Sequence, residues 1–325
     1  MSSPSPELAR LTDFPDRLSP MLVKELRQGM RTNLFTIAFI LLQAFMVLCV
    51  LIGASAPGDG AVSGFFWFFV IVTLLIVMPI RGFGALTSEI QLHTMDLIHL
   101  TELGAWRVTF GKWAALVAQT LLLVCGVLPY LVMRYFFGGI DLFTELIALF
   151  WTVIASMLLT ALTVGFSAFP SVLLRVTVIA GVVIGSTMLA GPALATLIRP
   201  STVGSPIKNI VLIQISTFIS SLFVIWFLLD MGASRIAPEA DNHATRKRCI
   251  ALVFGVLLML LPIFGIPPEP CFAITGILWT LVCLDALTEK PVNLPSILLP
   301  FARRWYLRPW PMLLAPGWHT GIFFF

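Results

Sequence analysis

Long runs of apolar residues, separated by short polar stretches, constrain the fold of this chain more than any other feature. An α-helix rises 1.5 Å per residue, so about 20 apolar residues cross the roughly 30 Å hydrocarbon layer of a bilayer. The sequence therefore predicts an all-α polytopic membrane protein with about eight transmembrane helices. These spans are expected at about 34–53, 65–80, 113–133, 146–168, 176–198, 209–229, 250–266 and 271–287.

The composition excludes most soluble functions. Only 11% of the 325 residues are charged and 58% are hydrophobic, whereas soluble domains carry about 25% charged residues. The five cysteines are scattered and show no spacing typical of a zinc site or a disulfide framework. No catalytic triad or pair of acids stands out, so we expect a protein without enzymatic activity of its own.

The distribution of positive charge predicts how the chain is oriented. Lys and Arg are enriched in cytoplasmic loops. With both termini inside, all but three of the 20 Lys and Arg residues fall on the cytoplasmic side; the exceptions are Arg134, Arg199 and Lys208. The chain then divides into a cytoplasmic segment at 1–33, a transmembrane domain at 34–287 and a cytoplasmic or interfacial tail at 288–325.

The residues before the first span have the pattern of an amphipathic helix. Ser19 can cap a helix whose first residue is Pro20. Leu22, Leu26 and Met30 would share one stripe, and we expect the helix to lie at the membrane surface with its polar residues toward the head groups. The alternative is an ordinary basic flank of the first span. The site residues assigned to this helix are Lys24, Glu25, Arg27 and Arg31.

A polar stretch at 81–112, here called the elbow, separates the second and third spans. Ser88 and Gln91 have the spacing of a capping box, so a helix can begin at Glu89 and end at Gly104. One hypothesis is a coupling helix that docks on a cytoplasmic ATPase, and the other is a solvated inner loop; these residues alone leave both open. His93, Asp96 and His99 are poorly spaced for a metal chelate, so no metal site is predicted.

The chain has no nucleotide-binding motif of its own. The only candidate is GAWRVTFGK at 104–112, which has six residues between its glycines and Trp113 after its lysine. A P-loop requires four residues there and then Ser or Thr. The predicted span cores also lack ionisable residues, which disfavours an ion-coupled carrier. Energy for any transport would thus enter through a separate subunit.

Three segments resemble the membrane subunit of type-2 ABC transporters, the permeases of ABC exporters. The first is PMLVKELRQGMR with its Lys24–Glu25 pair, and the third is Leu128-Pro129-Tyr130 followed by Gly138-Gly139. The second lies in the elbow, where the matching positions are Glu89, Thr94, Asp96, Leu97, Leu100, Gly111 and Lys112. The resemblance covers about the first 140 residues, and the usual six spans of that family leave the last two spans here without a counterpart.

The resemblance implies a dimeric permease, formed with a second permease chain and a separate P-loop ATPase that carries the ATP and magnesium. The elbow would transmit closure of the ATPase to the spans, and the expected contacts with the ATPase are Glu89, Thr94, Asp96, Leu97, Leu100 and Glu102. We expect an exporter of a bacterial inner membrane. The alternatives are a membrane scaffold without a transport cycle and, less favoured, an ion-coupled carrier.

Overall fold

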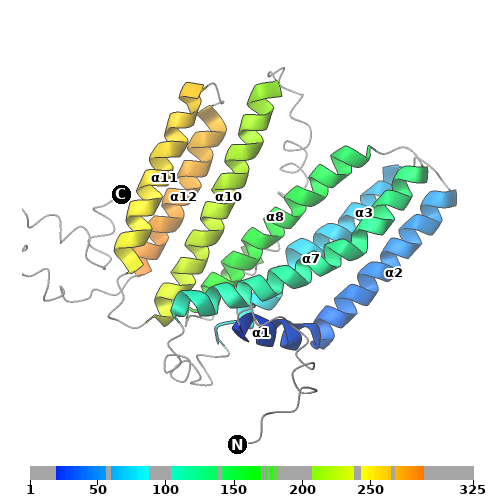
Figure 1. Cartoon of the computed structure of the whole chain (residues 1–325), viewed down its shortest axis with the longest axis horizontal. Helices are drawn as coiled ribbons and strands as arrows, with labels where there is room; N and C mark the ends of the chain where they lie inside the picture. Colours follow the sequence, from blue (N-terminus) through cyan, green and yellow to red (C-terminus); the bar gives the residue numbers. More distant parts are fainter. Residues whose placement is uncertain are drawn as a thin grey trace, which may run out of the picture.

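Helices make up all of the regular structure in the part of the chain that the structure describes. This computed structural model describes residues 20–55, 60–87, 104–137, 141–169, 207–237, 243–264 and 268–288, with isolated positions between 171 and 181. The long helices lean in the same direction at different angles, and the short α1 (Pro20–Met30) lies crosswise at one end of the bundle (Figure 1). The helix predicted to begin at Pro20 is therefore present.

Five helical segments in the described residues are long and apolar enough to cross a membrane. They are α2 (Asn33–Ser55), a composite second span at 62–84, α7 (Ala105–Phe137), α8 (Leu142–Ser167) and α10 (Ile207–Ile236). These correspond to predicted spans one to four and six. Most of the predicted span at 176–198 lies outside the described residues. The protein is thus an integral membrane protein, and candidate spans in the described residues match five of the eight predicted spans.

The last two predicted spans are present as helices, and the first of them includes charged residues. They are α11 (His243–Leu260), which continues into η5 (Leu261–Phe264), and α12 (Pro268–Thr288). The first two turns of α11 contain Arg246, Lys247 and Arg248. The prediction placed these bases in a loop before the seventh span, and that prediction was wrong. The helix begins earlier than the apolar run, so it includes the charges.

The second span changes its helical type along its length. It begins as α3 (Gly60–Ile71), passes through a π-helical turn, η2 (Val72–Val77), and ends as α4 (Met78–Ile80) and the 3₁₀ turn η3 (Arg81–Gly84). The hydroxyl of Ser156 on α8 donates a hydrogen bond to the carbonyl of Leu74 across 2.6 Å. This side chain from a neighbouring helix bonds the backbone where the π-helical turn departs from α geometry.

The core is centred on α8. One apolar cluster joins α2, the second span, α7 and α8 through residues such as Leu42, Phe66, Leu74, Leu123 and Leu149. A second cluster joins α7, α8 and α10 nearer to α1. The hydroxyls of Ser156, Thr160, Thr163 and Ser167 are buried in α8 and bond to backbone carbonyls. These four hydroxyls therefore face the protein interior.

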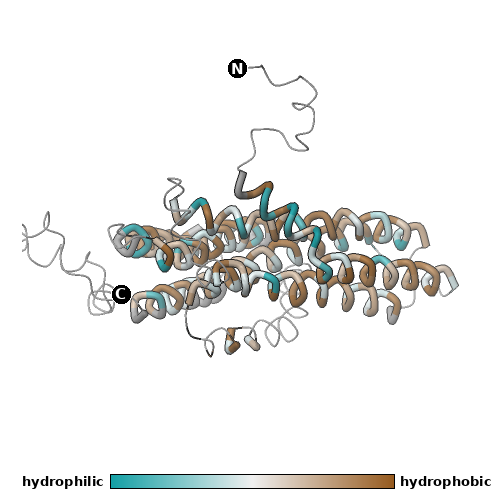
Figure 2. The backbone as a smooth tube through the Cα atoms, turned by 90° about the horizontal axis from the view of Figure 1, so that it is seen from below, coloured by the Kyte–Doolittle hydropathy of each residue, from teal (hydrophilic) through white to brown (hydrophobic). Residues whose placement is uncertain are grey.

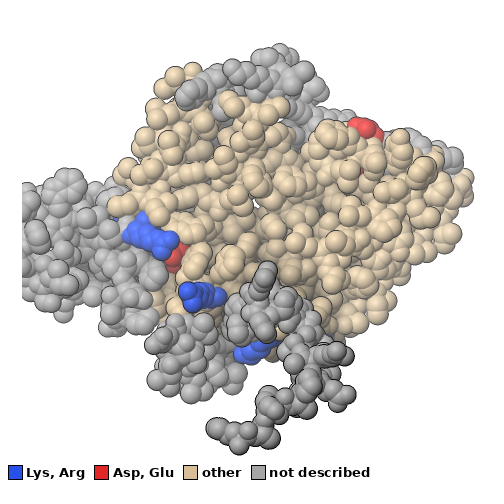
Figure 3. All heavy atoms as spheres, in the orientation of Figure 1, with Lys and Arg blue, Asp and Glu red and all other residues tan. Residues whose placement is uncertain are grey.

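The outer surface of the long helices is apolar. Large hydrophobic side chains are exposed along α2, α7 and α10, as expected for lipid-facing helices. The tube coloured by hydropathy is brown along the long helices and more teal on α1 (Figure 2). On the face drawn in Figure 3, the Lys and Arg atoms lie toward the lower side and most of the described surface is uncharged.

Candidate functional site

An ion pair fastens α1 to the third span. The ammonium of Lys112 on α7 donates to a carboxylate oxygen of Glu25 across 3.0 Å. The Lys112 side chain is only 4% exposed, and that of Glu25 is 19% exposed. A buried ammonium is costly without a partner, so this pair gives α1 a fixed position on α7.

A second contact fastens α1 to the end of the second span. The guanidinium of Arg81 donates to the carbonyl of Gly29 across 2.9 Å and to the hydroxyl of Thr32 across 3.0 Å. It also donates to the side-chain oxygen of Gln119 on α7. Gly29 and Thr32 lie in and just after the last turn of α1. Arg81 therefore links α1, the second span and the third span at one point.

These two contacts lie at the boundaries of the predicted elbow. The structure narrows the elbow, because 81–84 forms the last turn of the second span and 105–112 forms the first two turns of α7. The residues between them, 88–103, lie outside the described residues. These include all six residues predicted to contact the ATPase, which are Glu89, Thr94, Asp96, Leu97, Leu100 and Glu102. Both flanks of the intervening segment are held by the same helix, α1.

The site residues predicted on the first helix differ in how far their side chains are exposed. Lys24, Arg27 and Arg31 are exposed, whereas Glu25 is half-buried against α7. Leu22, Leu26 and Met30 are half-buried, and Met30 packs on the apolar cluster around α2. The apolar stripe of α1 thus packs in part on the protein, through Met30. The sequence pattern gave Glu25 no partner on another helix, whereas the structure pairs it with Lys112.

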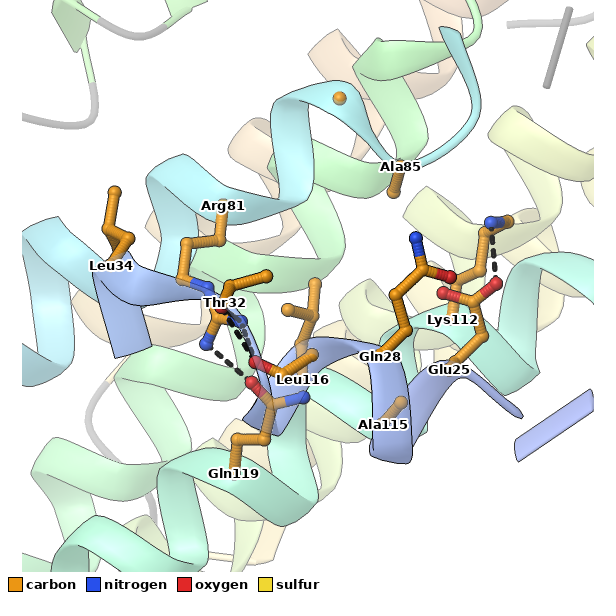
Figure 4. Close-up of a pocket in the computed structure, with 12 residues that line it drawn as sticks. Glu25, Gln28, Thr32, Leu34, Arg81, Ala85, Lys112, Ala115, Leu116 and Gln119 are labelled. Carbon is orange, nitrogen blue, oxygen red and sulfur yellow. Dashed lines mark hydrogen bonds and ion pairs between the residues drawn. The ribbon is translucent and has the colours of Figure 1, made fainter. Parts of the chain in front are cut away.

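A pocket lies between α1 and the ends of the two spans. Its volume is about 330 Å³, and its wall includes Arg81, Lys112, Gln28 and Gln119. The close-up shows Arg81 reaching toward Thr32 and Gln119 on one side, and Glu25 facing Lys112 on the other (Figure 4). Leu34, Ala85 and Leu116 add apolar surface to the wall.

A buried charge cluster occupies the opposite end of the bundle. Arg134, in the last turn of α7, donates to the hydroxyl of Ser63 across 2.8 Å and lies 3.7 Å from a carboxylate oxygen of Glu145. Trp67 donates its indole hydrogen to the same carboxylate across 2.8 Å, and the guanidinium lies 4.2 Å from the centre of the Phe66 ring. This cluster joins the second, third and fourth spans at the end remote from α1.

A third cluster joins α10, α11 and α12 at the same end as α1. Lys247 lies 2.5 Å from a carboxylate oxygen of Asp285, and Arg235 lies 3.7 Å from the other oxygen. Lys247 also donates to the hydroxyl of Ser234. Lys247, Arg248, Asp230 and Asp285 are all at least 96% buried. Lys247 and Arg248, which were predicted in a cytoplasmic loop, are instead part of the packing between these helices.

The described residues hold no group of three or more His, Cys, Asp or Glu side chains that could bind a metal ion. The weak candidate set of His93, Asp96 and His99 lies outside them. Three contact residues, Arg81, Thr32 and Gln119, were not singled out as site residues from the sequence. No pattern in the nearby sequence could have predicted these contacts, because Arg81 is 38 residues from Gln119 and 49 residues from Thr32.

Comparisons with known proteins give no information on function, so the function is argued from the chain's own residues. No protein-family model, no curated protein and no solved structure matches this chain.

Proposed function

We propose that this chain is the permease subunit of an ATP-driven ABC exporter, in which a separate ATPase moves the membrane helices through the 88–103 segment. The observation that carries this proposal is the double attachment of α1. Arg81 and Lys112 flank the segment, and both contact α1. A partner that displaced the segment would therefore act on the second span, the third span and α1 together.

The path from the attachment points into the bundle is continuous. Arg81 lies in the last turn of the second span, which contacts α8 through the bond from Ser156 to the carbonyl of Leu74. Lys112 lies on α7, which shares an apolar cluster with α8 and α10. Helices that are packed side by side can shift as units when one end is moved. The geometry thus supports a transmission element at the end that bears α1.

The placement of the buried charges favours an external energy source. Within the described spans, the buried ionisable side chains Lys112, Arg134 and Asp230 lie toward helix ends. Carriers driven by ions use ionisable groups near the middle of the membrane. We infer that energy enters from a partner ATPase, with ATP and magnesium on that partner, and that the cytoplasmic side is the end bearing α1 and most of the Lys and Arg residues. A second permease chain would complete the transport unit, and a bacterial inner membrane is its expected location.

The experiment that tests this proposal is purification of the tagged full chain from its native host in a mild detergent. Mass spectrometry of the eluate and an ATPase assay are the two measurements. A stoichiometric P-loop ATPase with ATP hydrolysis is the expected result. A chain that is purified alone or with unrelated membrane proteins, and without ATP hydrolysis, would contradict the proposal and favour a membrane scaffold.

A matched pair of variants tests the segment itself. Glu89→Ala with Asp96→Ala should leave the amount of chain in the membrane unchanged and reduce the ATPase recovered with it. The control is Lys24→Ala, which changes an exposed charge on α1 outside the segment. Equal recovery of the ATPase from the double variant and from the wild type would assign the contact to another part of the chain.

A further inference from the structure

The positive charge of Arg81 is balanced by no carboxylate among the described residues. Its hydrogen-bond partners are a backbone carbonyl, a hydroxyl and a side-chain amide, all of which are neutral. Neutral partners satisfy the N–H groups of a guanidinium but do not compensate its charge. A half-buried, uncompensated guanidinium beside a pocket is a common means of binding a phosphate group, because its planar donors match two phosphate oxygens.

The pocket next to Arg81 has the size of a ligand site and a net positive wall. Its volume of about 330 Å³ falls in the range of small-molecule sites, roughly 300–1,000 Å³. Three charged side chains line it, which are Arg81, Lys112 and Glu25. Since Glu25 is paired with Lys112, the net charge of the wall is that of Arg81.

The rest of the wall identifies the kind of phosphate compound. Leu34, Ala85 and Leu116 give the pocket an apolar side, and Leu34 is 48% exposed at the start of α2. An inorganic phosphate or a sugar phosphate would gain nothing from this surface. A phospholipid would place its head group against Arg81 and the first part of its chains along Leu34 and Leu116.

The position of the pocket in the bundle matches the depth of lipid head groups. Arg81 lies three residues before the end of the second candidate span, at 62–84. Lys24 and Arg27 are exposed on α1, and Arg31 is exposed just after its end, next to Thr32 of the pocket wall. Clusters of Lys and Arg at the membrane surface attract anionic lipids electrostatically.

We infer that the pocket between α1, η3 and α7 is a binding site for the head group of an anionic phospholipid, with Arg81 as the principal contact to its phosphate. This inference does not depend on a partner ATPase. A lipid bound there would contact α1 and both flanks of the 88–103 segment, so its head group would become part of the junction that joins them.

The test uses native mass spectrometry of the purified full chain, titrated with phosphatidylglycerol or phosphatidylcholine. The wild type should bind phosphatidylglycerol more tightly than phosphatidylcholine. Arg81→Gln should weaken phosphatidylglycerol binding at least about tenfold, which is the effect of losing one charge-assisted contact. The matched control is Arg107→Gln, which removes an exposed charge from the first turn of α7 outside the pocket and should leave binding unchanged.

A second pair of variants leaves the contacts of Arg81 in place. Gly84 lines the pocket, and a Cβ added to it would meet no heavy atom within 4 Å. Gly84→Asp therefore adds a negative charge without a clash, and Gly84→Asn adds the same volume without the charge. The Asp variant should lose the preference for phosphatidylglycerol, and the Asn variant should keep it, both with unchanged thermal unfolding.

Three outcomes would overturn the inference. The first is equal binding of the two lipids by the wild type. The second is equal binding of phosphatidylglycerol by the Gly84→Asp and Gly84→Asn variants, since the pocket would then not sense the charge of the lipid. The third is displacement of phosphatidylglycerol by an equal concentration of glycerol 3-phosphate, which would identify a soluble phosphate as the ligand.

Discussion

Gly165 on α8 and Gly232 on α10 face each other so closely that a Cβ built on Gly232 would lie 2.9 Å from the Cα of Gly165. A Cβ on Gly165 would clash with the backbone carbonyl of Leu228 on α10. Both glycines are buried. Small residues at such crossings let two membrane helices approach to backbone contact. The α8–α10 interface therefore depends on the absence of side chains at these two positions.

Gly165→Ala should destabilise the protein by about 1–3 kcal/mol, because the clash is with backbone and cannot be relieved by a side-chain rotation. The measurement is thermal unfolding in detergent, followed with a thiol-reactive dye that reports the buried Cys49 and Cys271. Gly64→Ala is the control, since its Cβ would meet nothing within 4 Å and alanine favours a helix over glycine. An unfolding temperature for Gly165→Ala equal to that of the control would contradict the close contact.

Glu25→Gln should loosen α1 while the long helices stay packed. The substitution removes the carboxylate that pairs with the buried Lys112, at about 1–3 kcal/mol. Limited trypsin digestion should then cut faster at Arg27 and Arg31. Exchange of the two charges, Glu25→Lys with Lys112→Glu, should restore much of the protection. Equal digestion rates of the wild type and Glu25→Gln would mean that the ion pair does not hold α1.

Asp285→Asn should destabilise the packing of α11 and α12 on α10. Lys247 would remain buried without its closest carboxylate, and breaking a buried pair from one side costs roughly 3–5 kcal/mol. The double variant Lys247→Met with Asp285→Leu removes both charges and should recover most of the unfolding temperature. A double variant as unstable as Asp285→Asn would show that the surrounding charges, and not this pair, determine the stability.

The N-terminus of α8 should lose its cap in acid. The hydroxyl of Thr144 and the backbone N–H groups of Thr144 and Phe143 donate to Asp141 and lower the pKa of its carboxyl group below the usual range. A lowered pKa in the folded state contributes stability above the unfolded pKa, and that contribution is lost as pH falls through the folded value. Hydrogen exchange of the Thr144 amide should therefore accelerate in strong acid.

Asp141→Asn is the control for this pH effect. An asparagine can still accept the hydrogen bond at the cap but does not titrate. Its exchange rate, corrected for the intrinsic effect of pH, should stay constant over the same range. The same acceleration in both proteins would assign the pH dependence to a different group.

The sequence was sufficient to predict the helices that are specified by residues close together in the chain. Helices cover the expected positions of the first four spans and the sixth, because a long apolar run in a membrane protein folds as a spanning helix. The ends are less accurate, since α7 begins at Ala105 where 113 was expected and α10 ends at Ile236 where 229 was expected. The helix at 20–30 was predicted from Pro20 and from an apolar stripe, both of which act over a few residues. The membrane class and the helical architecture follow from such patterns alone.

The contacts that position the candidate site could not be predicted in this way. Glu25 and Lys112 are separated by 87 residues, and nothing near either residue specifies the other. Lys247 and Arg248 were assigned to the cytoplasmic loop before the seventh span, because Lys and Arg are enriched in such loops. Lys247 is buried because α12 supplies Asp285, 38 residues later in the chain. Which residue pairs with which depends on helix packing, and the local pattern does not contain that information.

The π-helical turn at Val72–Val77 sets the direction in which the rest of the second span faces. It contains one more residue per hydrogen-bonded ring than an α-helix. If the same residues adopted regular α geometry, the extra residue would rotate the residues that follow by about 100°. Met78 and Pro79, which are buried, would turn away from their present neighbours, and Arg81 would turn away from α1. The π-helical geometry of one turn in the interior of this span therefore determines the angular register of the junction with α1.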